Sequence, residues 1–136
     1  MYIQDRTTKN FSLGRMRTWV AIENLLYERI PPMLENYDDE SVSGFDWDKR
    51  KNESNLVKHG LDFEEAIEVF YGPILLRRSD RNDEERWIAV GYSEARLVAV
   101  VFTRRADVIR IISARRARKN EESAYRNAKM GRPPKR

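Results

Sequence analysis

The second half of the chain alternates apolar and polar residues with a period of two, which predicts β-strands. The predicted strands cover 74–78, 86–92, 96–103 and 108–114, and a short strand over 45–47 precedes them. The strands follow one another through short polar turns, and such turns join antiparallel neighbours. The pattern therefore predicts an antiparallel sheet of about four strands plus a short N-terminal strand.

Three helices are predicted around this sheet. Asp48 is a typical N-cap residue, and Gly60 stands where a left-handed residue ends a helix. Asp62 and Glu65 resemble a capping box at the start of a second helix. The predicted helices cover Lys49–His59, 63–70 and 118–128. The order β-α-α-β-β-β-β-α predicts an α+β fold with the helices packed on one side of the sheet.

The first 44 residues differ from the rest of the chain. Apolar residues recur at helical spacing over 16–30 until two prolines end the pattern, and 38–44 is polar and turn-rich like a linker. We expect deletion of 1–43 to leave a folded body. The expected organisation is an N-terminal extension over 1–44, a folded domain over 45–128 and a flexible basic tail over 129–136.

Composition narrows the classes of function. Of the 136 residues, 35% are charged, against about 25% in typical domains. The absence of cysteine excludes disulfides, thiolate metal sites and cysteine nucleophiles, and with one histidine we expect no metal or cofactor. The sequence has no apolar run of about 18 residues and no signal-peptide pattern, so we expect a cytoplasmic protein without membrane spans.

The charge is unevenly distributed. The segment 109–136 holds ten Lys or Arg and two Glu, a balance of +8, so the remaining residues must sum to −4 to give the net +4 of the chain. A mildly acidic body with a basic end suggests a polyanionic partner, and nucleic acid is the leading candidate.

Arginines cluster at the ends of the last two predicted strands. A guanidinium fork binds phosphate through two hydrogen bonds and stays charged, so these residues are candidate phosphate ligands. Strict alternation would place Ile109, Ile111, Ser113 and Arg115 on one face, and Arg110 and Arg116 on the other. The alternative is an edge strand protected by charge.

Lys58 and His59 form a second candidate group at the end of the first helix. Histidine titrates near neutral pH and can act as acid or base, with Lys58 beside it. The alternative is structural, since cations complement a helix C-terminus. A shared active site requires this helix end and the end of the last strand to converge.

Several motifs together resemble the BrnT family of type II toxins. They are Phe45-Asp46-Trp47-Asp48, Lys51-Asn52, Asn55-Leu56, Lys58-His59-Gly60, Phe63-Glu64-Glu65-Ala66, Glu85 to Gly91, Val101-Phe102-Thr103 and Arg110 to Ala117, with Glu121 or Glu122 and Tyr125 in the final helix. The resemblance covers about 45–128, in order and at the expected spacing. The extension over 1–44 departs from it, because family members usually begin close to the first motif.

The resemblance implies a RelE-like fold and a metal-independent endoribonuclease that cuts RNA and inhibits translation. It also implies a BrnA-type ribbon-helix-helix antitoxin, with which the toxin represses its own operon at operator DNA. The rival interpretations are a non-catalytic nucleic-acid-binding module and a corepressor that acts through its antitoxin.

The candidate roles follow from that reaction. Lys58 and His59 are the acid–base candidates, with Tyr125 as an alternative proton donor or a stacking surface. Arg104, Arg115 and Arg116 are assigned to phosphate binding and transition-state stabilisation, and we expect the antitoxin to cover them. The remaining RNA-binding candidates are Arg105, Arg110, Ser113, Arg118 and Lys119.

Overall fold

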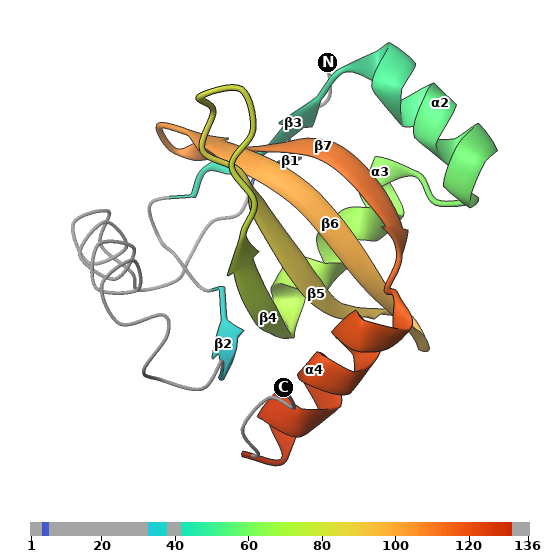
Figure 1. The fold of residues 1–136 in the computed structure, drawn as a ribbon. Helices are drawn as coiled ribbons and strands as arrows, with labels where there is room; N and C mark the ends of the chain where they lie inside the picture. The colour runs from blue at the N-terminus through green and yellow to red at the C-terminus, as the bar shows by residue number, and fades with distance from the viewer. Residues whose placement is uncertain (1–3, 6–32, 38–41, 132–136) are drawn as a thin grey trace.

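A computed structural model of the chain describes residues 4–5, 33–37 and 42–131. Their centre is a seven-stranded sheet in the order β1-β3-β7-β6-β5-β4-β2 (Figure 1). The strands are β1 (Gln4–Asp5), β2 (Leu34–Asn36), β3 (Gly44–Trp47), β4 (Pro73–Arg78), β5 (Trp87–Ser93), β6 (Arg96–Arg105) and β7 (Val108–Arg116). The α+β class is confirmed, whereas the predicted strand count is too low.

The sheet is mixed rather than antiparallel. All neighbouring strands are antiparallel except β3 and β7, which pair in parallel from Gly44↔Val108 to Trp47↔Ile111. After the helices and strands between them, the chain returns to β3, so that β7 lies next to β3 and runs in the same direction.

The first predicted helix is confirmed at both ends. Helix α2 spans Lys49–His59, and the Asp48 carboxylate accepts hydrogen bonds from the amides of Arg50 and Lys51. Gly60 ends the helix with a φ of 68°, in the left-handed region. The cap residues read from the sequence therefore act as predicted.

The second predicted helix is shorter than expected. Helix α3 spans Phe63–Ala66 and continues as the 3₁₀ helix η1 over Ile67–Tyr71. Asp62 caps it by accepting a 2.8 Å hydrogen bond from the Glu65 amide. In a 3₁₀ helix residues three apart share one side, which turns both Ile67 and Phe70 into the core.

The helices cover both faces of the sheet, and the prediction of a single covered face is wrong. Helix α3 and η1 pack on the face that carries the larger core, with Phe102, Ile109 and Ile111. Helix α4 (Lys119–Lys129) packs on the opposite face through Tyr125, against a second apolar cluster (Figure 1). That cluster contains Leu75, Val90, Leu97 and Ala99. Each face therefore has its own core.

The predicted domain boundary at Gly44 does not match the packing. Strand β2 pairs with β4, and β1 pairs with β3. Tyr37 is 4% exposed and makes edge-to-face contacts with Phe70 and Phe102, while Val42 is 1% exposed. The described residues before position 44, which are 4–5, 33–37 and 42–43, thus belong to the body. The predicted helix over 16–30, residues 38–41 of the predicted linker and residues 132–136 of the predicted tail lie outside the described residues.

Candidate functional site

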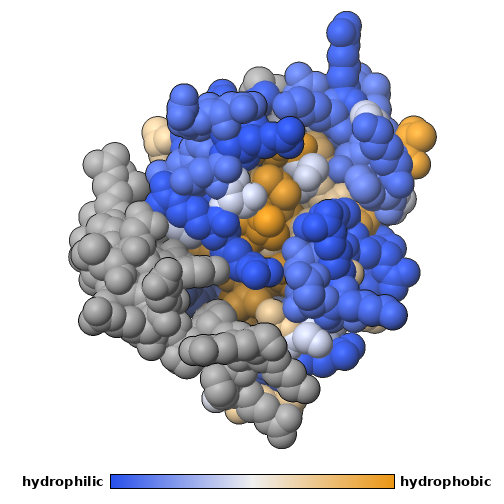
Figure 2. All heavy atoms as spheres, viewed as in Figure 1, coloured by the Kyte–Doolittle hydropathy of each residue, from blue (hydrophilic) through white to orange (hydrophobic). Residues whose placement is uncertain are grey.

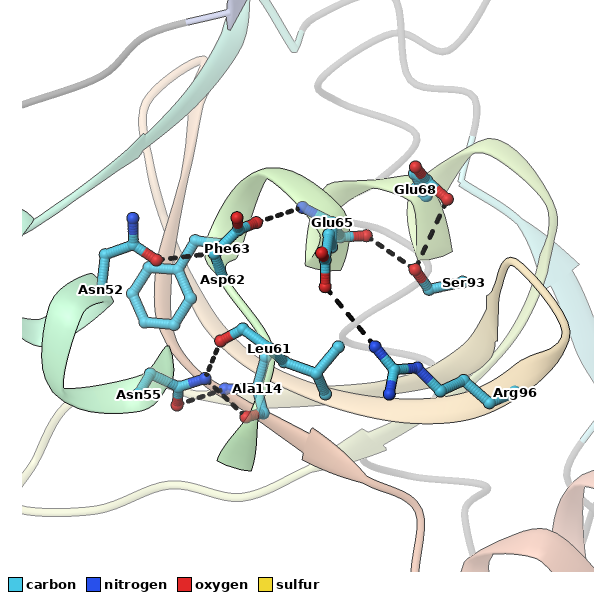
Figure 3. Close-up of polar contacts among 10 residues, drawn as sticks. All are labelled: Asn52, Asn55, Leu61, Asp62, Phe63, Glu65, Glu68, Ser93, Arg96 and Ala114. Atoms are coloured by element: carbon cyan, nitrogen blue, oxygen red, sulfur yellow. Dashed lines mark hydrogen bonds and ion pairs between the residues drawn. The ribbon is translucent and has the colours of Figure 1, made fainter. Parts of the chain in front are cut away.

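The side chain of Asn55 joins α2 to β7 (Figure 3). Its Nδ2 donates to the carbonyl oxygens of Ala114 and Leu61, both at 2.8 Å, and its Oδ1 accepts from the Ala114 amide at 3.1 Å. A side-chain amide offers the same donor and acceptor as a peptide group. Asn55 therefore continues the pairing of β7 beyond Ile111, where β3 ends.

This contact brings the end of α2 to the end of β7. Lys58 and His59 follow Asn55 by three and four residues, so they lie on the same side of the helix. Both are exposed. The two chain segments that a shared active site requires do converge. We call this region, made of Asn55, Lys58, His59, Ser113, Arg116, Arg118 and Lys119, the α2–β7 junction.

Strand β7 contains one extra residue. Val101 of β6 pairs with Ser113, whereas the next residue, Phe102, pairs with Ile111. Ile112 therefore has no partner in β6 and forms a β-bulge. Bulges re-aim the side chains that follow them and are frequent beside active sites.

The bulge changes the faces occupied at the end of β7. Ser113 and Arg115 lie on the same face as Arg110, because their partners in β6 are alternate residues. Arg116 pairs with Val98 and lies on the other face. The predicted face assignment of these residues is wrong, because it assumed an unbroken alternation.

Arg115 is held in an ion pair with Glu121. Its Nη1 and Nη2 lie 2.6 and 3.0 Å from the two carboxylate oxygens, and the Arg118 amide donates to the same carboxylate at 2.8 Å. Desolvation alone would raise the pKa of Glu121, but these hydrogen bonds and the charges of Arg115 and Arg118 lower it below its ordinary value. The fork of Arg115 thus fastens β7 to α4, which does not support its predicted role as a phosphate ligand.

Unlike Arg115, the basic residues of the junction have no carboxylate partner in the described part of the chain. Lys58, Arg116, Arg118 and Lys119 are exposed, and none forms an ion pair with a carboxylate of the described residues. The charges of Lys58, Arg116 and Lys119 are available to a phosphate, whereas that of Arg115 is largely neutralised and that of Arg118 already acts on Glu121.

Three of the predicted arginines lie toward the other end of β7. Arg104 and Arg105 pair with the first residues of that strand, about 20 Å from Arg115 along it. Each contacts groups of its own region: Arg104 Nε donates to the Ala106 carbonyl at 3.0 Å, Arg105 lies 3.8 Å from Glu84, and Arg110 lies 3.4 Å from Asp46. The structure does not bring them to the junction.

Tyr125 is part of the core under α4. It is 2% exposed, its hydroxyl donates to the Pro73 carbonyl at 3.0 Å, and its ring meets Tyr92 edge to face. Burial, with a smaller contribution from Tyr92, raises the pKa of Tyr125. A buried ring cannot stack on a base, so this predicted role is wrong, and the geometry does not support a role in proton transfer.

The sequence analysis assigned no role to two buried polar residues, although Asn55 stands in one of the family motifs. Asn55 is 5% exposed, and Ser93 is 2% exposed, with its hydroxyl donating to the Glu65 carbonyl at 2.9 Å (Figure 3). Arg96 lies 3.5 Å from the Glu65 carboxylate and ties the β5–β6 turn to α3. The burial of Asn55 could not be predicted from the sequence, because the other residues of α2 are mostly exposed and nothing in their pattern distinguishes this position.

Two further findings apply to the described part of the chain. It contains no group of three or more His, Cys, Asp or Glu side chains that could hold a metal ion. It also contains no helix long and apolar enough to cross a membrane.

Comparison with known proteins identifies the family. Residues 47–121 match the model of the ribonuclease toxin BrnT of type II toxin-antitoxin systems. No individual curated protein matches the chain. The matched segment runs from the end of β3 to the first turn of α4, and so contains the whole α2–β7 junction. Since it spans more than half of the sequence, the chain belongs to the BrnT family of ribonuclease toxins.

Proposed function

We propose that this protein is the toxin of a type II toxin-antitoxin pair and acts as a metal-independent endoribonuclease that inhibits translation, on a RelE-like fold. The observation that supports the site is the Asn55 contact with Ala114, which joins the helix that carries Lys58 and His59 to the strand that ends at Arg116. Cleavage of translated RNA would take place in the cytoplasm.

The reaction requires three elements. A base takes the proton of the 2′-hydroxyl, a cation stabilises the charge on the phosphate, and an acid protonates the departing 5′-oxygen. Lys58 and His59 are our acid–base candidates, and Arg116 is the candidate for transition-state stabilisation. Arg118 and Lys119 bind the flanking phosphates, and Ser113 orients one. Arg115 takes part indirectly by positioning β7.

The products follow from the nucleophile. Attack by the 2′-hydroxyl breaks the bond to the 5′-oxygen and leaves a 2′,3′-cyclic phosphate and a 5′-hydroxyl. DNA has no 2′-hydroxyl, so it should resist cleavage.

The partner we propose is a BrnA-type antitoxin that lays an acidic amphipathic segment across the junction. Two apolar side chains of α2 support this choice: Leu56 is 49% and Val57 is 87% exposed, and both precede Lys58 directly in the sequence. An acidic segment with apolar residues complements both the cations and these side chains. The complex would then repress its own operon through the DNA-binding part of the antitoxin.

Incubation of the purified full chain with a labelled RNA and a DNA of the same sequence, in the presence of a chelator, tests the enzymatic function. We expect RNA fragments that end in a 2′,3′-cyclic phosphate, and intact DNA. Binding of RNA without cleavage would instead support a non-catalytic binding module. Growth arrest on expression without the antitoxin separates a toxin from a corepressor.

A further inference from the structure

Four residues form a straight row across the sheet on the face that α4 partly covers. Arg77 of β4 pairs with Ile88 of β5, Ile88 pairs with Val101 of β6, and Val101 pairs with Ser113 of β7. Residues paired across neighbouring strands point to the same face, so all four side chains share it. The row is about 14 Å long, since strands lie about 4.8 Å apart.

The row borders the region that α4 covers. Leu75, Val90 and Ala99 belong to the next row and are buried against the helix. The four side chains of the row itself are only half-buried. Figure 2 shows the molecule from this side, where hydrophobic residues lie at the bottom of a hollow and hydrophilic residues border it above and to the right.

The two ends of the row carry polar groups without a partner. Neither the guanidinium of Arg77 nor the hydroxyl of Ser113 makes a hydrogen bond or ion pair with another described residue. The face therefore combines an apolar floor with an arginine at one end, Arg77, that has no carboxylate partner among the described residues.

We propose that this row is a binding track for single-stranded RNA leading to the α2–β7 junction, with Arg77 as a substrate-positioning residue. One base lies on Ile88 and Val101, Arg77 binds a phosphate at the far end, and Ser113 marks the entry to the junction. This inference rests on the proposed ribonuclease function. The unpaired guanidinium of Arg77 favours a phosphate, and the narrow apolar floor suits an unpaired base better than a duplex, whose bases are stacked inside.

The track makes a prediction about substrate length. A dinucleotide at the junction does not reach Arg77, whereas an oligonucleotide of about eight residues spans the row. For the longer RNA, Arg77→Ala should raise KM about tenfold, as expected for one lost charged hydrogen bond, and should leave kcat within about twofold. For the dinucleotide, the variant and the parent should behave alike.

Salt dependence gives a second readout that a merely structural role would not change. Each phosphate contact to single-stranded nucleic acid contributes about 0.7 to the slope of log K against log salt. Arg77→Ala should reduce this slope by about that amount. The matched control is Arg81→Ala, which removes the same charge from the exposed β4–β5 connection and should change neither KM nor the slope.

The possible outcomes separate the two proposals. A loss of RNA affinity in Arg77→Ala, with an unchanged Arg81→Ala, supports the track even if neither variant nor parent cleaves RNA. Cleavage with equal KM and equal salt slopes in parent and Arg77→Ala overturns the track and leaves the ribonuclease function in place. Equal loss in both variants also overturns it, since the effect would then be one of net charge.

Discussion

Asn55 and Ala114 are 59 residues apart in the sequence, and the side-chain amide of Asn55 binds both backbone polar groups of Ala114. The contact lies where β3 has ended, so these groups would otherwise be buried without a partner. One side chain therefore fixes both the edge of the sheet and the position of α2 relative to β7.

Replacing Asn55 tests this structural role. Asn55→Ala leaves the carbonyl groups of Ala114 and Leu61 and the Ala114 amide without their partner, and each such group costs about 1–3 kcal/mol. Because the three groups lose the same side chain, their costs do not simply add, and we expect a total loss of about 2–4 kcal/mol in the free energy of unfolding, measured by denaturant titration. The control Asn120→Ala removes an exposed amide from α4 and should change stability by less than about 0.5 kcal/mol. Equal stability of both variants would show that the contact is dispensable.

The ion pair between Arg115 and Glu121 predicts a pH dependence of stability. The pKa of Glu121 is lowered on folding, so its contribution is present above the unfolded pKa of about 4.5 and is lost as the pH falls through the folded value. Glu121→Gln leaves Arg115 unpaired and should cost about 3–5 kcal/mol at pH 7. The difference from the parent should shrink between pH 5 and pH 3.

The neighbouring Glu122 provides the control for that experiment. Its carboxylate lies 4.0 Å from Arg126 at the surface, so Glu122→Gln should change stability by less than about 1 kcal/mol at any pH. A difference between Glu121→Gln and the parent that stays constant down to pH 3 would contradict the role of the ionised carboxylate.

Tyr37 tests whether the residues before β3 belong to the body. Tyr37→Ala removes a ring that packs against Phe70 and Phe102 and should cost about 3–5 kcal/mol. Tyr71→Ala removes the same side chain from a site that is 51% exposed and should cost less than about 1 kcal/mol. Thermal melts of the two variants decide the question. Deletion of 1–43 should therefore destabilise the protein. Unchanged stability after that deletion would instead support the predicted domain boundary at Gly44.

The sequence predicted the local structure better than the long-range pairing. Asp48, Gly60 and Asp62 mark helix ends because their own side chains or dihedral angles make the cap. The bulge at Ile112 leaves no comparable sign, since an isoleucine fits a bulge and a regular strand alike. One extra residue was enough to exchange the faces of Ser113 and Arg116.

The candidate site was predicted in part for the same reason. Residue types suited to phosphate chemistry can be read from a sequence, so the cations of the junction were found. The contacts that each of these side chains makes in the folded protein cannot be predicted from residue type. The ion pair of Arg115, the burial of Tyr125 and the distance of Arg104 from the junction all depend on which strands and helices meet.

We propose that Lys58 and Arg116 act together on one phosphodiester bond. The most direct test is a double-mutant cycle, in which RNA cleavage is measured for the full chain, Lys58→Ala, Arg116→Ala and the double variant, with thermal melts to exclude unfolding. Arg126→Ala, which removes an exposed arginine from α4, is the control for charge. We expect each single variant to lose about 30- to 1000-fold in rate, and the double variant to lose less than the product of the two. Cleavage at the parental rate by both single variants would contradict a site at the α2–β7 junction.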